Sequence, residues 1–571
     1  MKRVLLATAA LVAAVVVLTF ISLPPKARLL DTSWSDGSVP GALHIHTNRS
    51  DGRSGPDEIA AAAARAGLKF IVFADHGDGT REPEPPTYRS GVLCLDGVEI
   101  STTGGHYLAM DMDAAPYPLG GEPRGVVADV QRLGGFGIAA HPDSPKAELR
   151  WNDWDAPIDG IELINPDTSW RVRVLAEGWR SKLQLLRALI TYPVRSSETL
   201  GALLTDSHAL PEHWNTLSAR RRVVGTAGVD AHAKLELRAL DPGDNRYSLP
   251  IPSYESSFRS LSVHVVPESP LNGNAAADAV RVMEAVRNGR LYTVIDAWAS
   301  PAAFEFTATN AKGMARSGEA LAVGGPVSLR VRSNAPAGFL TTVWRGSEPL
   351  VRDKAERDFT VDAGEDPAVY RVEIRAQDRP ERPPWIISNP IYVRGDETEV
   401  TPAVRPAAAR QWPLFDGHST AGWTRENDST SVAAIDAVQM VNGTELRFRY
   451  GLSGGSVVGQ YAGAAIEIAR GLGAYERLVF TARAEQPMRI SVQVRAEFAG
   501  APSKRWQRSV YLDPTESEHT VSFADMDPVG TTDTDRVIPE STRAIMFIVD
   551  TTNTMPGASG RIWFKNVRLE R

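Results

Sequence analysis

The stretch Gly41-Ala-Leu-His44-Ile-His46-Thr-Asn-Arg-Ser-Asp51-Gly52 joins an apolar strand pattern to three side chains that can bind metal. Side chains at positions i and i+2 of a strand point to the same face of a sheet, so His44 and His46 can hold one ion together. Asp51 follows in the loop after the strand, close enough to serve a neighbouring ion. This stretch therefore predicts a strand that delivers ligands to a metal site.

Further motifs place histidine or carboxylate after an apolar, strand-like run. The runs are Phe70–Ala74, Val92–Leu95, Gly137–Ala140 and Val223–Thr226, and the residues after them include Asp75, His76, Glu99, His106, His141, Asp230 and His232. Imidazole with carboxylate suits Zn, Mn or Fe(II), and the lack of thiolate argues against a cysteine-held zinc. A lone histidine at a strand end is more often structural. Recurrence in one half of the chain instead predicts a shared cluster of two or three divalent ions.

From Gly41 to about Ala299 the apolar runs alternate with helical patterns, which predicts an α/β layer or barrel. The clearest expected helices are Pro56–Ala66, stopped by Gly67, then Arg124–Leu133, and Ala275–Arg287, capped by Asn274. Catalytic residues of α/β barrels gather where strands end and loops begin. The five motifs occupy such positions.

After about residue 300 the hydrophobic period changes to two. Val327, Leu329 and Val331 alternate with polar residues, as do Tyr370, Val372 and Ile374, which predicts half-buried antiparallel strands. We expect an Ig-like β-sandwich over residues 300–397, a linker over 398–410 and a jelly-roll sandwich over 411–571. The apolar run Ala544–Val549 fits a sandwich interior.

The order of the motifs resembles that of the PHP (polymerase and histidinol phosphatase) metallohydrolases. Their pattern of H-x-H-T-x-x-S-D-G, then D-H, then G-x-E, then later His and D-x-H, recurs in this order between residues 41 and 232. The resemblance implies a distorted seven-stranded (β/α) barrel over residues 41–299 that binds three metals. By the same resemblance, the first ion is held by His44, His46, Glu99 and Asp230, the second by Glu99, His106 and His141, and the third by Asp51, His76 and His232.

Two later segments carry further resemblances. Pro384–Val393 is similar to the β-domain ending of an exported, carbaryl-hydrolase-type (CehA/McbA-like) branch of that family, which widens the implied substrates from phosphate esters to carbamates and carboxylic esters. Residues 411–571 resemble a galactose-binding-like or carbohydrate-binding jelly roll, which implies glycan contact. Fold resemblance alone does not name a substrate.

Other polar residues beside the motifs are weaker candidates. Arg53, Lys146 and Lys234 could clamp an anionic substrate, although each also fits an ordinary surface cation. Asp143, Glu162 and Asn165 are placed to orient a ligand imidazole from behind.

The N-terminus predicts export. Lys2 and Arg3 precede an apolar stretch from Val4 to Leu23, which Pro24 ends. About twenty apolar residues suffice to cross a bilayer as a helix, and a cleaved signal peptide begins in the same way. Residues 1–25 therefore predict a membrane anchor or a signal peptide, with a buried core helix as the third alternative, and 26–40 predict a linker. Either export device places the rest of the chain in the periplasm, at the cell surface or outside the cell.

The net charge of the chain restricts the classes of partner that we expect. The formal net charge is −7, and no long basic run lies outside the N-terminus, so we expect no stable nucleic-acid partner. We predict a metal-dependent hydrolase of a small ester substrate, most simply a phosphoesterase, in which a metal-bound water attacks and no single side chain is assigned as catalytic. The alternatives are a carbamate or carboxylic ester hydrolase of the same fold, or a non-catalytic, metal-stabilised binding protein at the cell surface.

Overall fold

A computed structural model describes residues 17, 19–207, 209–236, 246–395, 410–441, 443–455, 459–498, 500–530 and 536–571. The chain divides into two compact units. Unit 1 comprises residues 1–77, 82–113 and 130–399, and unit 2 comprises 78–81, 114–129 and 400–571. Most of the predicted anchor and of the linker 398–410 lies outside the described residues. Within them, no helix combines the length and apolarity needed to cross a membrane.

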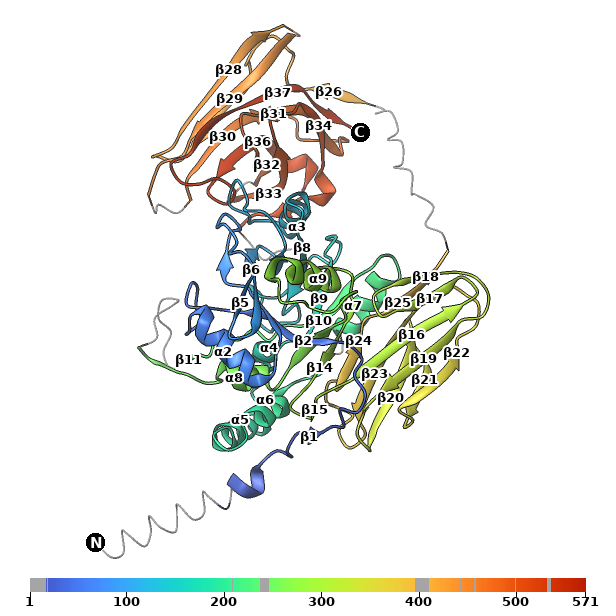
Figure 1. The fold of residues 1–571 in the computed structure, drawn as a ribbon. Coiled ribbons are helices and arrows are strands. Elements are labelled where there is room, and N and C mark those ends of the chain that lie inside the picture. The colour runs from blue at the N-terminus through green and yellow to red at the C-terminus, as the bar shows by residue number, and fades with distance from the viewer. Residues whose placement is uncertain are drawn as a thin grey trace, which may run out of the picture. The chain divides into compact units, whose positions relative to one another are not determined.

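Unit 1 is built on a curled, mixed sheet flanked by helices (Figure 1). Its strands are β2 (Val39–Ile45), β3 (Phe70–Phe73), β4 (His76–Gly77), β5 (Thr87–Arg89), β6 (Val92–Thr102), β7 (Gly105–Met110), β8 (Phe136–Ala140), β9 (Gly160–Ile164), β10 (Val224–Ala227), β13 (Ser262–Val265) and β14 (Leu291–Val294). β2, β3 and β6 run parallel, and so do β8, β9 and β10. The segment after β10 returns to β2, where Val229 N donates to Leu43 O and His46 N donates to Ala231 O. The sheet thus brings its two ends together.

Helices α2 (Pro56–Ala66) and α9 (Ala275–Arg287) have the predicted bounds, and α3 (Pro123–Arg132) lies within one residue of its prediction. α2 ends because Gly67 adopts a left-handed φ of 89°, which glycine reaches without strain. The other helices are α4 (Pro166–Leu175), α5 (Trp179–Thr191), α6 (Ser196–Leu203), α7 (Ala209–Ser218) and α8 (Tyr254–Phe258).

The β-region after residue 300 forms two layers within unit 1. One sheet holds β16 (Phe304–Asn310), β17 (Gly313–Arg316), β19 (Ser328–Ser333) and β22 (Asp358–Asp362). The other continues the curled sheet through β18 (Ala320–Ala322), β20 (Phe339–Arg345), β21 (Glu348–Lys354), β23 (Ala368–Ala376), β24 (Ile386–Ser388) and β25 (Ile391–Arg394), because β24 pairs with both β14 and β23. The barrel-like region and this sandwich therefore share one sheet.

That shared sheet corrects one prediction. β23 was expected to be half-buried, yet Arg371 and Glu373, on its polar face, are both about 4% exposed. The two side chains pair with each other, and the Arg371 guanidinium also stacks over Trp214 and Trp344. The strand has cover on both faces because it lies where the two regions meet.

The segment Pro384–Val393 has a structural role. The Asn389 side chain accepts from Gly225 N at 2.8 Å and lies within donor distance of Gly225 O at 2.8 Å and Leu291 O at 3.1 Å. It thereby fastens β10 to β14 from the end of β24. Residues 26–40, predicted as a linker, are also held to unit 1, since β1 (Arg28–Leu29) pairs with β15 (Ala299–Ser300).

Unit 2 is a β-sandwich of two antiparallel sheets. One holds β26 (Gln411–Pro413), β28 (Val432–Met440), β29 (Gly443–Gly451), β31 (Arg477–Ala484), β34 (Ser517–Ser522) and β37 (Ser559–Glu570), and the other β27 (Trp423–Asn427), β30 (Tyr461–Glu467), β32 (Met488–Phe498), β33 (Ala501–Leu512), β35 (Asp527–Pro528) and β36 (Thr542–Asp550). As predicted, the run in β36 is buried on both faces, because Ile545 and Phe547 enter the main core while Met546 and Ile548 form a smaller cluster. Trp423 and Trp506 also lie in the main core.

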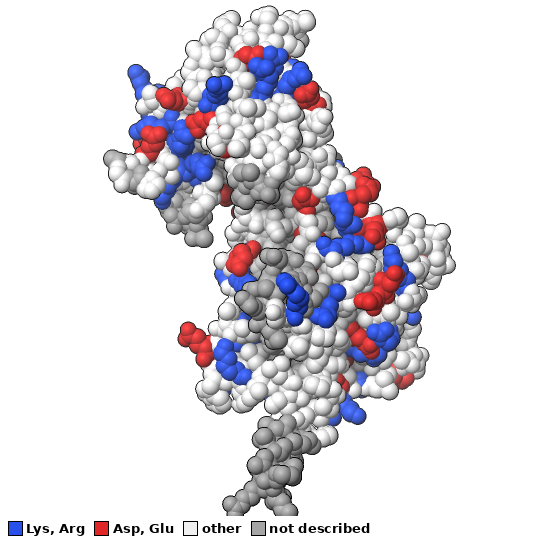
Figure 2. Space-filling model, turned by 90° about the vertical axis from the view of Figure 1, so that its left-hand side faces the viewer, with Lys and Arg blue, Asp and Glu red and all other residues white. Residues whose placement is uncertain are grey.

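Surface charge is mixed. On the face drawn in Figure 2, basic and acidic side chains lie interspersed over both units.

Candidate metal centre

The nine residues assigned as metal ligands by the resemblance come together in unit 1. Their nitrogen and oxygen atoms form overlapping groups in which all members lie within 4.8 Å of one another. The groups are His46, Asp51, His76 and His232; His44, Glu99 and His141; His44, His46 and Asp230; and His76, Glu99 and His106. The geometric groups overlap more than the ion-by-ion assignment does, since His46 joins the Asp51 group as well.

Strand ends position these side chains. His44 lies at an irregularity in the pairing of β2 with β3, His76 begins β4, and His141 and Asp230 follow the ends of β8 and β10. Among described residues other than glycine, few have a positive φ, yet three belong to this cluster: His44 at 64°, His141 at 31° and Asp230 at 49°. This backbone region costs energy for such residues and persists only where the surroundings impose it. The fold therefore tolerates strain to aim these groups inward.

Glu99, which is 1% exposed, is the centre of the buried part. Its Oε1 lies 2.8 Å from His106 Nδ1 and 2.9 Å from His141 Nε2. Its Oε2 lies 3.3 Å from the Nε2 atoms of His44 and His46, and 3.2 Å from His76 Nδ1. One carboxylate thus faces five imidazoles.

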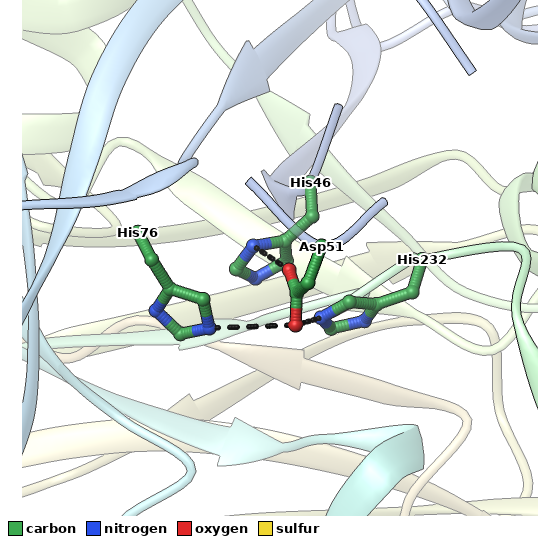
Figure 3. A group of neighbouring side chains, drawn as sticks. All are labelled: His46, Asp51, His76 and His232. Atoms are coloured by element: carbon green, nitrogen blue, oxygen red, sulfur yellow. Dashed lines mark ion pairs between the residues drawn. The ribbon is translucent and has the colours of Figure 1, made fainter. Parts of the chain in front are cut away.

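Asp51 is the centre of the more open part. Figure 3 shows its carboxylate between the rings of His46, His76 and His232. The distances are 3.3 Å to His46 Nδ1, 3.7 Å to His76 Nε2 and 3.3 Å to His232 Nε2. The side chains of Asp51, His76 and His232 are 24–36% exposed, so this side of the cluster faces solvent.

Electrostatics of the cluster favour cations. Burial lowers the pKa of His46 to about 4, and the charge of His232 contributes to this shift. Burial also opposes ionisation of Glu99, but the charge of His44 and the hydrogen bonds from His106 and His141 hold the Glu99 pKa well below its usual range. Similar neighbours keep the pKa of Asp230 well below its usual range despite burial. The carboxylates therefore stay ionised, and against the effect of burial they raise the pKa of His44 well above its usual range and the pKa values of His141 and His232 to about 9.

A set of contacts behind the ligands fixes their orientation, as predicted for Glu162 and Asn165. Glu162 Oε1 lies 2.7 Å from His44 Nδ1, and Glu162 Oε2 accepts from His141 N at 2.7 Å. Asn165 Nδ2 lies 2.9 Å from Glu162 Oε2 and 3.3 Å from Asp230 Oδ2. Asn165 Oδ1 meanwhile accepts from Thr168 N and caps α4.

Two of the predicted substrate-binding cations contact residues outside the cluster. Arg53 Nη1 donates to Ser248 Oγ at 3.0 Å, and Lys146 Nζ lies 4.0 Å from Glu148. Lys234 is half-buried beyond His232. Asp143 is also half-buried; burial raises its pKa, against a hydrogen bond to Ser207 and the charge of His141.

Two contributions were not recognised from the sequence. The Tyr254 hydroxyl lies 2.8 Å from His46 O and 3.1 Å from His232 O, so α8 ties together two ligand-bearing segments. Asp75 accepts from Thr47 N and Ser50 Oγ and thereby shapes the loop that carries Asp51. The T-x-x-S spacing and the strand end at Asp75 were visible signals for the second contribution, whereas nothing local marked Tyr254.

Comparisons with known proteins name no family for this chain. No family model matches it. An uncharacterized protein of Methanocaldococcus jannaschii, MJ1587, is 29% identical over 137 residues, which are 22% of this chain and 80% of the relative.

Similar solved structures include the family 11 carbohydrate-binding module of the cellulase Lic26A-Cel5E of Clostridium thermocellum, with a TM-score of 0.25 and 14% identity, covering 29% of this chain and 96% of the module. A family 30 module of the cellulase Cel9D-Cel44B of the same organism has a TM-score of 0.22 and 8% identity, with 28% and 96% covered. At these TM-scores the likeness assigns no ligand to this chain.

Proposed function

We propose that the protein is a metal-dependent hydrolase of the PHP type that cleaves ester bonds, with phosphate esters as the first substrate class to test. The observation that carries this proposal is the convergence of nine imidazole and carboxylate groups on one partly open site. Enzymes that combine buried carboxylates, several imidazoles and a solvent-facing side are candidates for metal-assisted hydrolysis.

The residues fit divalent ions. His44 Nε2 and both ring nitrogens of His46 are buried and have no hydrogen-bond partner, which is costly unless something else occupies their lone pairs or protons. Nitrogen and carboxylate donors without thiolate suit Zn, Mn or Fe(II). Two or three such ions would be held by His44, His46, Asp51, His76, Glu99, His106, His141, Asp230 and His232. Bound ions of this kind supply a nucleophile at neutral pH and neutralise charge that develops on the substrate.

Residues of the chain would then hold the ions, orient the imidazole rings and leave one side open to the substrate. Glu99 faces both halves of the cluster and sets their spacing. Glu162 fixes the rotation of the His44 ring from its far side. The exposed edge formed by Asp51, His76 and His232 leaves room for an ester group to approach.

The test combines metal analysis with an activity panel. We expect the purified full-length protein to carry two or three equivalents of divalent metal and to cleave p-nitrophenyl phosphate mono- or diesters. His141→Ala should lower both metal content and turnover, whereas His418→Ala, which removes an exposed histidine of unit 2, should change neither.

The other outcomes discriminate among the alternatives. Turnover of carbamates or carboxylic esters alone would favour the carbaryl-hydrolase-type branch. Full metal loading without turnover of any ester class would reject the enzyme and favour a metal-stabilised binding protein.

Export and glycan contact are part of the same proposal. Cell fractionation with protease protection tests whether the bulk of the chain lies outside the cytoplasm. Glycan-array binding tests the sandwich over residues 411–571, in which Trp423 and Trp506 are buried and therefore cannot stack on a sugar.

A further inference from the structure

Helix α5 presents an apolar stripe to solvent. Trp179, Leu183 and Leu186 are 70%, 54% and 53% exposed, and half-buried Ile190 follows them. Positions i, i+4, i+7 and i+11 share one face of a helix. The opposite side of α5 buries Ala188 and Thr191 against the rest of unit 1. Large apolar side chains grouped in this way on a surface mark an interaction site.

Basic side chains flank this stripe. Arg180, Lys182 and Arg187 lie on α5, and the helix contains no acidic residue. The Arg180 guanidinium lies 5.7 Å from the centre of the Trp179 ring. An apolar stripe bordered by cations and bearing a tryptophan is the composition of helices that lie in a membrane interface.

Other exposed apolar groups lie on segments that adjoin α5. Leu175, at the end of α4, is 57% exposed, and Phe20 and Ile21 are 66% and 77% exposed. Arg187 Nε donates to Ser22 O at 2.5 Å, and the Arg195 guanidinium donates to Pro24 O. Residues 19–23, the described end of the apolar stretch, therefore lie beside α5, as Figure 1 also shows.

We propose that the α5 face is a docking surface for a lipid bilayer with anionic headgroups. Its thirteen residues span about 20 Å, too short to cross a hydrocarbon core of about 30 Å, so the helix would lie in the interface plane. Trp179, Leu183 and Leu186 enter the boundary between headgroups and acyl chains, while the flanking cations contact lipid phosphates. The single sign of charge on α5 itself and the adjoining exposed Phe20 and Ile21 favour a bilayer over a second copy or another protein.

The proposed docking of α5 sets how far the candidate metal centre lies from the lipid surface. α4 runs about 15 Å from Asn165, whose side chain contacts Asp230, to the exposed Leu175 at the docking surface. A docked α5 thus holds the cluster one short helix away from the lipid surface.

The experiment uses full-length protein in vesicles of phosphatidylcholine with phosphatidylglycerol. Leu186→Cys, labelled with an environment-sensitive fluorophore, should shift to the blue and be quenched by lipids that carry a nitroxide near the headgroup. Val280→Cys is the matched control, since Val280 is a 56% exposed apolar residue on α9, and its label should not be quenched. Wild-type protein sets the background, because Cys94 is buried and burial raises its pKa to about 11.

The proposal is overturned if the Leu186 label is quenched no more than the Val280 label. A blue shift without nitroxide quenching also overturns it, because protein and not lipid then covers the stripe. Arg180→Gln combined with Lys182→Gln should reduce the quenching in the anionic vesicles and leave that in phosphatidylcholine alone unchanged. If the quenching is equal in both vesicle types, with and without these substitutions, then anionic headgroups do not contribute to docking.

Discussion

Two groups of buried charged side chains behave in opposite ways. In unit 2, Arg489 and Asp129 are 5% and 1% exposed and form a two-point pair, with Nη2–Oδ1 at 2.6 Å and Nε–Oδ2 at 2.9 Å. Arg489 also donates to Ser509 Oγ and Gly125 O, so its charge and its donors are matched. In unit 1, the group around Glu99 keeps buried nitrogens of His44 and His46 that make no hydrogen bond, although carboxylate oxygens lie 3.3 Å away.

The contrast distinguishes buried charges that stabilise the fold from buried charges that are available for function. The matched pair fixes the unit 2 part of α3, residues 123–129, on the sandwich without needing a ligand from solution. An unmatched cluster on a strained backbone is unfavourable by itself and persists only where surrounding contacts impose it. Under the function proposed above, bound cations would offset this cost.

The largest expected effect comes from Glu99→Gln. The substitution keeps the shape of the side chain but removes the charge that faces five imidazoles. Because two ligand groups share this residue, more than one equivalent of metal should be lost, and activity should fall by more than the roughly 100-fold typical of residues behind the ligands. Elemental analysis and turnover measure both. Unchanged metal content would mean that Glu99 does not bridge.

Substitutions in the Arg489–Asp129 pair should change the stability of unit 2. Asp129→Ala leaves a buried guanidinium without its partner and should lower the free energy of unfolding of unit 2 by about 3–5 kcal/mol. Replacing both partners, Asp129→Leu with Arg489→Met, should restore most of that loss, since a well-packed apolar pair needs no charge compensation. Urea denaturation monitored by tryptophan fluorescence compares the variants. Equal destabilisation by the single and double variants would contradict this account.

A smaller effect is expected from Gly228→Ala, which touches no ligand. A Cβ at this position would lie 1.9 Å from Glu162 Oε1, so the carboxylate that holds the His44 ring must move. Metal affinity should fall by about 10–100-fold. Gly178→Ala is the control, because a Cβ there meets no atom within 4 Å. Competition with a fluorescent chelator gives the affinities, and equal values for both variants would remove Glu162 from the positioning role.

The sequence predicted the features that depend on the local pattern of residues. The bounds of α2 and α9 follow from Gly67, Asn274 and the spacing of apolar residues, and the strands that carry the ligands follow from short apolar runs. The convergence of the nine ligands could be predicted because each motif directly follows such a run. The distorted seven-stranded barrel and the roles of the ions stay predictions.

What the sequence did not predict depends on distant contacts. Tyr254 lies far along the chain from the histidines whose carbonyls it contacts, and no local pattern marks that pairing. The burial of Arg371 and Glu373 arises because β23 joins two regions. Residues 114–129 belong to unit 2 through contacts such as Glu122 with Ser509, which lie far apart in sequence.

The smallest expected effect tests an intermediate case, a half-buried carboxylate that accepts hydrogen bonds from hydroxyl groups. Asp296 accepts from Ser262 Oγ at 2.6 Å and Ser300 Oγ at 3.0 Å. Burial raises its pKa to about 6, and these hydrogen bonds only partly offset the shift. The folded state therefore holds a proton more tightly than the unfolded state, so the stabilising contribution is complete below about pH 4 and is lost as pH rises through 6.

Asp296→Asn removes this titration while keeping an acceptor for one hydroxyl. The variant should be more stable than wild type by about 1 kcal/mol at pH 7.5, a value reduced from the full shift because the side chain is partly exposed, and the difference should vanish near pH 4. Thermal unfolding across that pH range measures it. A constant difference would show that Asp296 keeps the same proton occupancy in both states, and hydroxyl donors would then match a half-buried carboxylate as fully as Arg489 matches Asp129.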